Sequence, residues 1–306
     1  MAKMHAPMAQ VSVVIVCMGN PAVHLYACLD SLTEQNRTPL DVWVVAYQMA
    51  ADHRMELAAR HPAIHIIESR EVRGFAENNN LALRQIESEY CFVVNDDTLQ
   101  SMPVVDRLLE DFAKLPENAA VVQPRIVFGD GRVQTCGRAP WTAWRYMKHY
   151  LHLVDETQPT PWSMQEGLFQ SYTLNGACFL IKTAVFREMG WFDERYFFTP
   201  EDIALGHQLN AAGYTVWADG NVEITHLAGV TAGPMEAAIK PARVKGALLF
   251  YGEGKWLKTK ALALFIWSVE AVRYLKHWGH CDSARNILRS VFDGASAKET
   301  FIRFRP

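Results

Sequence analysis

The 306-residue sequence lacks several features that would place it in a class at once. None of its six cysteines forms a C-x-x-C pair and most lie in apolar runs, so neither a disulfide framework nor a zinc site is expected. No apolar run approaches the ~20 residues of a membrane span, and residues 1–10 contain no stretch of signal-peptide length. These absences favour a cytoplasmic protein in a reducing compartment.

Charged residues make up 21% of the chain, close to the average for globular proteins, and the net charge is −3. Half of the residues are apolar, so the chain can bury a sizeable core. The net charge hides an asymmetry: residues 240–306 carry 13 Lys and Arg against 5 Asp and Glu, and the remainder carries 17 against 28. An acidic body without a recognised nucleic-acid motif argues against a nucleic-acid partner. The basic tail indicates a separate partner.

Apolar runs alternate with helical stripes over the first third of the chain, which predicts a doubly wound α/β fold with a mostly parallel sheet flanked by helices. The predicted strands are 11–16, 42–46, 64–67 and 90–94, and the predicted helices are 23–34, 52–60 and 78–87. In such sheets ligands bind beyond the carboxyl ends of the strands.

The pattern changes after residue 100. We expect helices at 102–115, 183–189 and 203–212, strands at 120–127, 174–181 and 215–218, and a hairpin turn at 128–132. Residues 137–170 are rich in aromatics without clear periodicity, which predicts a long loop over a site. The last 60 or so residues are predicted to be helical. We expect a main domain over 1–239, with halves at about 11–100 and 101–239, and a basic helical C-terminal extension over 240–306.

Two acidic clusters carry the clearest chemical signal. Asp96 and Asp97 directly follow a buried strand, where like charges are costly unless a cation or hydrogen-bond donors compensate. A divalent cation shared with substrate phosphates is one solution, and capping of the next helix by Asp97 or Thr98 is the other. Glu201 and Asp202 follow a run of aromatics, which suits either a general base in an apolar wall or the first turn of a helix. The residues alone leave these alternatives open.

Two further signals are weaker. His226 lies near the end of a probable strand, where a lone histidine is more often structural than a ligand. The segment Arg73 to Asn80 begins a helix with a glycine and amides, a start that can receive a phosphate or serve as a plain cap.

Taken together in chain order, these sequence segments resemble the family 2 glycosyltransferases of the GT-A fold, especially bacterial rhamnosyltransferase-like members. The matching stretches are residues 11–16, Gly74-Phe75-Ala76 with Asn79-Asn80, Asn95 to Thr98, Asn175-Gly176-Ala177 with Leu180 to Lys182, Gly190 to Glu194, Glu201-Asp202, Ala212-Gly213-Tyr214 and His226.

The resemblance implies a metal-dependent inverting transfer of a hexose or deoxyhexose. The sugar moves from a nucleotide-diphosphate donor to a glycan or lipid-linked glycan, in bacterial surface polysaccharide synthesis. It makes Asp202 the catalytic base with Glu201 beside it, and Asp97 and His226 ligands of Mg²⁺ or Mn²⁺. It makes residues 11–100 the nucleotide-sugar half and 101–239 the acceptor half. Donor contacts are expected from Cys17, Asn20, Tyr47, Asp52, Gly74, Phe75, Asn79, Asn80, Asn95, Asp96 and Asp97. Acceptor contacts are expected from Asn175, Gly176 and Trp191.

The sequence departs from the family at the nucleobase. The usual Asp after the second strand is missing, and the strand ends in Tyr47 and Gln48 with no acid before Asp52. The nucleotide is therefore open, and a catalytically inactive nucleotide-sugar or glycan-binding module remains the alternative function. A nucleotidyltransferase would need a glycine-rich, basic loop after the first strand, which Cys17 to Asn20 do not provide.

Residues 255–278 mix Lys, Arg and His with Trp and Leu. This composition suits an interfacial helix on anionic lipid, which would place the protein peripherally on the inner face of the cell membrane. A helix packed on the main domain with a solvated basic edge, or a homodimer contact, remains open as well.

Overall fold

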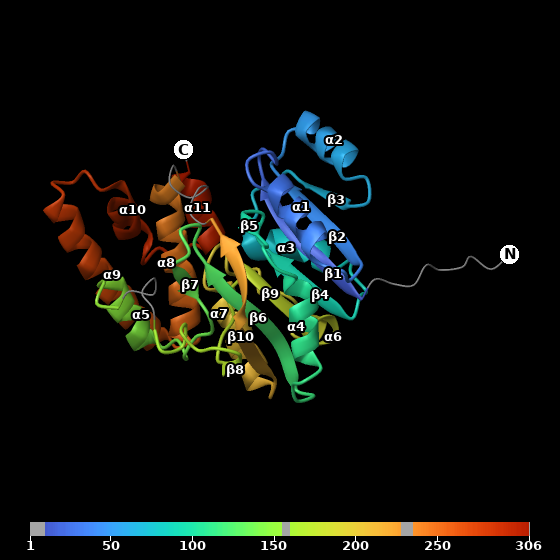
Figure 1. Cartoon of the computed structure of the whole chain (residues 1–306). Helices are drawn as coiled ribbons and strands as arrows, with labels where there is room; N and C mark the ends of the chain where they lie inside the picture. The colour runs from blue at the N-terminus through green and yellow to red at the C-terminus, as the bar shows by residue number, and fades with distance from the viewer. Residues whose placement is uncertain (1–9, 155–159, 228–234, 306) are drawn as a thin grey trace.

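The structure is a computed structural model and describes residues 10–154, 160–227 and 235–305 (Figure 1). The predicted α/β fold is confirmed: over these residues a ten-stranded sheet carries helices on both faces. The strands are β1 (Val11–Met18), β2 (Leu40–Tyr47), β3 (His65–Ser69), β4 (Tyr90–Val94), β5 (Thr98–Leu99), β6 (Ala119–Val127), β7 (Val133–Thr135), β8 (Leu168–Ser171), β9 (Cys178–Lys182) and β10 (Thr215–His226). The helices are α1 (Leu25–Gln35), α2 (Ala51–Arg60), α3 (Phe75–Leu83), α4 (Val104–Phe112), α5 (Ala143–Tyr150), α6 (Thr183–Glu188), α7 (Glu201–Ala211), α8 (Glu236–Gly252), α9 (Trp256–Lys276), α10 (Asp282–Ser290) and α11 (Ala297–Phe304).

The strand order is β3-β2-β1-β4-β9-β6-β10-β5, with β7 beside β6 and β8 beside β10. Strands β1 to β4 are parallel, and β9 runs against both β4 and β6, so β6 and β10 point the same way as β1 to β4. Their carboxyl ends therefore share one edge of the sheet, which includes Met18, Tyr47, Val94 and His226. We call this the carboxyl edge.

Strand β1 shows why the core has two layers. Val11, Val13 and Ile15 pack on the side of α1 and α4, whereas Val14 packs on the side of α3 and α7. Successive side chains of a strand point to opposite faces, so a continuous β-branched run is buried on both.

The C-terminal helices form the predicted helical extension and pack against the rest of the chain. Figure 1 shows α9 and α10 with α5 at the end of the molecule away from β3. Helix α8 approaches the loop before α7 so closely that a Cβ on Gly246 would lie 2.1 Å from the Thr199 carbonyl oxygen. Residues 239 and 240 both lie within α8, so the two predicted units share this helix, and their division stays a prediction.

The prediction of a loop at 137–170 was wrong for two stretches, because α5 lies within this range and β8 overlaps its end. Residues 155–159 lie outside the described part of the chain. The aromatic residues that hid the helical period are the contacts of α5: Tyr146 and Tyr150, one turn apart, pack on the cluster formed by α8, α9 and α10. Since this packing is tertiary, local periodicity did not reveal it.

Other element boundaries shifted for local reasons. Helix α3 begins at Phe75 instead of residue 78, because the Glu77 carboxylate accepts a hydrogen bond from the Gly74 N–H. Strand β9 begins at Cys178 rather than 174, after a turn closed by the Cys178 N–H and the Asn175 carbonyl. Strand β10 continues beyond residue 218 to His226, through a register shift after Asp219.

Candidate active site

The first acidic cluster meets His226 at the carboxyl edge. Asp97 follows β4, and the end of β10 is brought beside it by pairing of His226 with Thr98 on β5. The His226 Nε2 atom lies 3.1 Å from Asp97 Oδ1, and both side chains are largely buried. Asn95 Nδ2 lies 3.4 Å from the same nitrogen. The structure thus brings together the two predicted metal ligands.

Gln134 on β7 orients this histidine, and sequence reasoning missed it. The Gln134 Oε1 atom lies 2.9 Å from His226 Nδ1. When Nδ1–H donates to this oxygen, the Nε2 lone pair is free to face a cation, the arrangement that metal-binding histidines usually have. Burial raises the pKa of Asp97, but the hydrogen bond and charge of His226 outweigh it and leave that pKa below its ordinary value.

Asp96 faces the end of β1. Burial raises the pKa of Asp96 to about 6; the hydrogen bond with the Cys17 thiol lowers it and the charge of Asp97 raises it. Burial also raises the pKa of the Cys17 thiol, which keeps it neutral. His24, just before α1, was not predicted, yet its charge lowers the pKa of both aspartates. Cys17 and Asp96 are therefore neighbours, and their role in binding the sugar donor stays a prediction.

Whether the site can hold a metal depends on Asp97 and His226. Among residues 10–154, 160–227 and 235–305, no group of three His, Cys, Asp or Glu side chains could enclose an ion alone. The 3.1 Å between Asp97 Oδ1 and His226 Nε2 nevertheless matches neighbouring ligands of an octahedral cation, which lie ~3 Å apart at bond lengths of ~2.1 Å. Two protein ligands leave positions for diphosphate oxygens and water. The pair thus fits a divalent cation shared with a diphosphate.

The second acidic cluster begins α7, and Asp202 is held on three sides. Its Oδ2 accepts a 3.2 Å hydrogen bond from the Gly176 N–H and lies 3.5 Å from Arg138 Nη1, while Oδ1 accepts from the Ile203 N–H at 2.7 Å. Arg138 was not predicted, because it follows β7 in the segment expected to be a loop. Its guanidinium forms a long ion pair with the Asp202 carboxylate.

One turn, Asn175 to Ala177, connects the two acidic clusters. The Ala177 carbonyl accepts from the Asn95 N–H at 2.9 Å, and the Gly176 N–H donates to Asp202. The Asn175 side chain closes the turn by accepting from the Ala177 N–H. These residues lie between the metal side and the carboxylate side, and their role in acceptor binding stays a prediction.

Glu201 differs from its neighbour. It is buried, and its Oε2 atom has no hydrogen-bond partner in the described structure. Burial and the charge of Asp202 raise the pKa of Glu201 well above its ordinary value, against smaller lowering effects of Arg243 and Arg138. Glu201 thus has one carboxylate oxygen without a partner, whereas both carboxylate oxygens of Asp202 accept hydrogen bonds.

The helix α3 residues mainly support the fold. Asn80 is fully buried, and its amide bonds the Phe192 backbone and the Glu194 carboxylate. Asn79 donates to the Phe75 carbonyl within the helix. The ring of Phe75 lies beside Gly176, near the acids. Binding of the nucleotide-sugar donor by these residues stays a prediction. The contacts of Asn80 hold α3 against the loop before α7.

Gly74→Ala is expected to lower the free energy of unfolding by about 2 kcal/mol, the size of an overpacking defect. A Cβ at this position would lie 1.9 Å from the Phe197 carbonyl oxygen, so backbone must move. Urea unfolding measures the effect, with Gly129→Ala as control because its Cβ would meet only the Leu227 side chain at 3.4 Å. Equal unfolding midpoints for Gly74→Ala and the wild type would show that this close approach is absent in solution.

A cavity of about 240 Å³ lies at the ends of β1 and β2. Met18, Tyr47, Gln48 and Arg73 line one side, and Phe301 and Arg305, within and just after α11, are among the residues of the other. Burial raises the pKa of Tyr47, whose hydroxyl accepts from the Arg73 N–H at 3.4 Å. Because Met18 and Tyr47 end β1 and β2, this cavity lies at the carboxyl edge.

Three predicted residues lie apart from these groups. Asn20 and Asp52 are exposed, and each accepts a hydrogen bond from a nearby backbone N–H. Neither lines the cavity beside Tyr47. Trp191 packs edge-on against Phe186 and carries the Arg187 guanidinium over its ring. No contact within the described residues joins Trp191 to Asp97 or Asp202, so its acceptor role stays a prediction.

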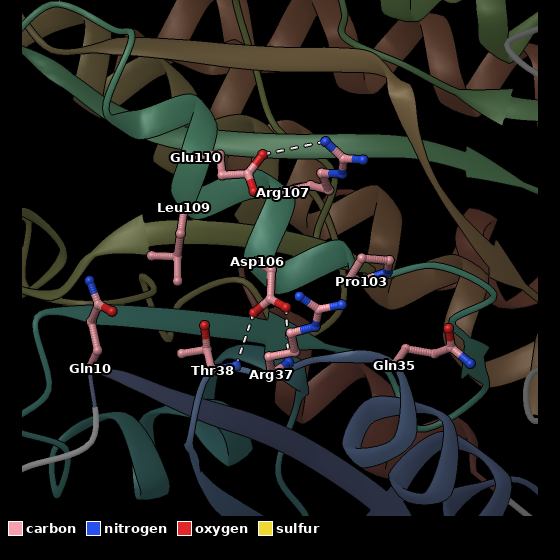
Figure 2. A pocket seen from close by; sticks show the side chains of 9 residues that line it. All are labelled: Gln10, Gln35, Arg37, Thr38, Pro103, Asp106, Arg107, Leu109 and Glu110. Carbon is pink, nitrogen blue, oxygen red and sulfur yellow. Dashed lines mark hydrogen bonds and ion pairs between the residues drawn. The ribbon is translucent and has the colours of Figure 1, made fainter.

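A wider hollow of about 770 Å³ lies at the opposite edge of the sheet (Figure 2). Gln10 and Thr38, which line it, precede β1 and β2, so it faces the amino ends of the strands. Figure 2 shows the Asp106 carboxylate accepting from the Arg37 and Thr38 N–H groups, at 2.9 and 3.0 Å. Because this carboxylate is used in joining α4 to the loop before β2, the hollow's size does not indicate a reaction site.

Comparisons with known proteins agree with this geometry. Residues 7–240 match the model of the family described as "Glycosyltransferase like family 2". An N-acetylglucosaminyl-diphospho-decaprenol L-rhamnosyltransferase of Mycobacterium tuberculosis is 26% identical over 265 residues, which cover 80% of this chain and 85% of the relative. An O-antigen biosynthesis protein, RfbC, of Myxococcus xanthus is 26% identical over 224 residues, covering 71% of this chain but 17% of that protein.

Two solved structures show the same GT-A fold at 12% identity. One is GalNAc-T7 with UDP, GalNAc and Mn²⁺, with a TM-score of 0.61 over 92% of this chain, which spans 56% of that structure's length. The other is the mannosyltransferase PcManGT of Pyrobaculum calidifontis with GDP-Man and Mn²⁺, with a TM-score of 0.54 over 97% of this chain and 87% of that one.

Proposed function

The chain belongs to the family 2-like glycosyltransferases, and from this premise we propose a metal-dependent, inverting transfer from a nucleotide-diphosphate sugar to a lipid-linked glycan. The proposal rests chiefly on one observation. In the turn at Asn175 to Ala177, the Ala177 carbonyl bonds the Asn95 N–H, next to the Asp97–His226 pair, and the Gly176 N–H bonds Asp202. A donor diphosphate and an acceptor hydroxyl can therefore meet in one cleft at the carboxyl edge.

Asp97 and His226 would hold Mg²⁺ or Mn²⁺, with Gln134 fixing the imidazole. The cation would offset the negative charge that develops on the departing diphosphate. Its use is supported by the spacing of the two ligands and by the Mn²⁺ in both related structures. Asp96 and Asn95 lie beside the pair on the donor side.

Asp202 would be the base that takes the proton of the attacking hydroxyl. A base must be ionised and reachable, and Asp202 is partly exposed and 3.5 Å from a guanidinium. Glu201, which is buried and has a raised pKa, fits the second role of shaping the wall beside it. Attack from the side opposite the diphosphate would invert the anomeric carbon.

The donor nucleoside would occupy the cavity beside Tyr47, where the Gln48 amide stands in place of the family's aspartate. A deoxyhexose donor such as a nucleotide-linked rhamnose is supported by the activity named for the Mycobacterium tuberculosis relative. That name also supports a sugar-diphospho-lipid acceptor and a role in surface polysaccharide synthesis.

Calorimetric titration of nucleotide sugars with Mn²⁺, followed by assays of donor hydrolysis and transfer, tests the proposal. We expect one nucleotide class to bind, with affinity that depends on the metal. Binding without hydrolysis or transfer would instead support the inactive binding module, and failure of every nucleotide sugar to bind would refute both.

We also propose that α9 rests on the membrane surface. No helix within the described residues is long and apolar enough to cross a bilayer. One face of α9, including Leu262 and Ile266, is buried in the protein. At 3.6 residues per turn the opposite face carries Leu257, Leu264 and Leu275, which are 74, 57 and 75% exposed.

The flanks of this outer face carry Lys258, Lys260 and Lys276, all exposed. An apolar stripe flanked by cations suits the interface of an anionic bilayer. A second copy of the chain would bring two sets of cations together, so lipid is the better match for this charge.

Leu264→Glu is expected to weaken binding to phosphatidylglycerol vesicles by about ten-fold or more, since burying a leucine contributes about 1.5–3 kcal/mol. Vesicle sedimentation measures this, with Ile302→Glu on α11 as an equally apolar, exposed control. Dimers in solution that Leu264→Glu dissociates, without vesicle binding by the wild type, would assign the face to a second copy.

A further inference from the structure

A cavity of about 310 Å³ lies between the start of α7, helix α8 and the aromatic segment that contains α5. Pro200 and Ile203 line it, and Glu201 and Asp202 stand between these two residues in the chain. Consecutive Cα atoms are 3.8 Å apart, so a bound group is adjacent to the backbone that carries the proposed base. The cavity is formed by elements other than β4 and β10, which carry the proposed metal ligands.

Three hydrogen-bond donors of this cavity lack a full complement of acceptors. Arg243 on α8 is exposed and has no ion pair or hydrogen bond in the described structure. Lys240 lies 3.6 Å from the buried Glu270 carboxylate, which Arg273 already pairs. The indole N–H of Trp141 is buried without an acceptor, an exception for a buried donor.

The described residues that line the cavity include no carboxylate. The cavity therefore offers positive charge and N–H groups and calls for a ligand with negative charge that only accepts hydrogen bonds. Phosphate groups have these properties, and arginine binds them with short, charge-assisted hydrogen bonds.

The remaining walls are mostly apolar, with Thr199 and His149 as polar residues among them. The rings of Tyr146 and Tyr251 stack with centroids 4.7 Å apart, and Val244 and Ala247 complete this side. These side chains belong to a cluster that continues to Ile266 on the inner face of α9. The ligand is thus expected to join an anionic group to a hydrocarbon chain that leads towards the proposed membrane face.

We propose that this cavity binds the diphosphate of a polyprenyl-linked sugar acceptor, with Arg243 and Lys240 as its phosphate ligands. The inference rests on the proposed function and names the acceptor that the same active site uses. Held by its diphosphate beside α7, the acceptor presents its sugar to Asp202 while its chain follows α8 and α9 to the bilayer. The donor diphosphate is bound separately, at Asp97 and His226.

The test is a calorimetric titration of the full chain with farnesyl diphosphate, without divalent metal so that the donor site does not compete for it. We expect the wild type to bind farnesyl diphosphate but not farnesol. Arg243→Gln should weaken binding about ten-fold or more, as expected for a lost charge-assisted hydrogen bond. Arg289→Gln, an exposed arginine on α10, is the matched control and should bind as the wild type does.

A second variant, Trp141→Phe, keeps an aromatic ring but removes the N–H donor and should weaken binding to a smaller extent. Unchanged affinity in Arg243→Gln, or no binding by the wild type, would overturn the proposal. Inorganic pyrophosphate binding as tightly as farnesyl diphosphate would overturn the assignment to a lipid-linked ligand. Titration of nucleotide sugars with Mn²⁺ tests the proposed function separately, and Arg243→Gln should leave that affinity unchanged.

Discussion

Asp202→Asn is expected to lower kcat by about 10²–10⁴-fold, the range for a general base, and to leave the dissociation constant of the nucleotide sugar nearly unchanged. Asparagine has almost the same shape, and its single oxygen can still accept one of the two hydrogen bonds that the Gly176 and Ile203 N–H groups donate to Asp202. It cannot take the proton of the acceptor hydroxyl. Steady-state kinetics combined with donor titration separate the two effects.

The matched control is Asp282→Asn, which changes another acid in the first turn of a helix, on α10. We expect it to retain full turnover. An equal loss of donor affinity and turnover in Asp202→Asn would mark this aspartate as part of the donor site. Unchanged kcat would exclude it as the base.

Asp97→Asn is expected to lower turnover by at least about 10²-fold, because a catalytic metal stabilises transition-state charge by several kcal/mol. It should also abolish the gain in donor affinity that Mn²⁺ gives the wild type. A chelator should reduce the wild type to the level of the variant and leave the variant unchanged. Donor titration with and without Mn²⁺ measures both effects.

A double-mutant cycle with His226→Gln tests whether the two side chains share one ion. If they do, the double variant should lose little more than either single variant, because each change already removes the site. Additive losses would mean that Asp97 and His226 act independently. Thermal unfolding in the absence of metal serves as the control, because the pair also joins β5 and β10.

Most of the fold could be predicted from the amino-acid sequence. Strands β1, β2, β4 and β6 lie on short apolar runs, because burial on two faces demands such runs. The parallel order of these strands then places Asp96 and Asp97 at a ligand-binding edge, whatever the distant chain does.

The site was only partly predictable. A lone histidine such as His226 gives no periodic signal, so its role at the metal site came from family resemblance and not from its own surroundings. Gln134 and Arg138 gave no signal at all, because a glutamine in a short strand and an arginine after it are common on any surface. Helix α5 was hidden since its aromatic residues are stabilised by α8 and α9, which lie about a hundred residues further along the chain.

By itself, the sequence determined the alternation of strands and helices, the acidic strand end after β4 and the acidic start of α7, because these depend on neighbours within a few residues. Tertiary structure alone decided that Gln134 orients His226 towards Asp97 and that Arg138 faces Asp202. It also decided that Arg243, on a C-terminal helix, lines a cavity beside the start of α7. These residues belong to segments far apart in the chain, and only the packing of the sheet and its helices brings them together.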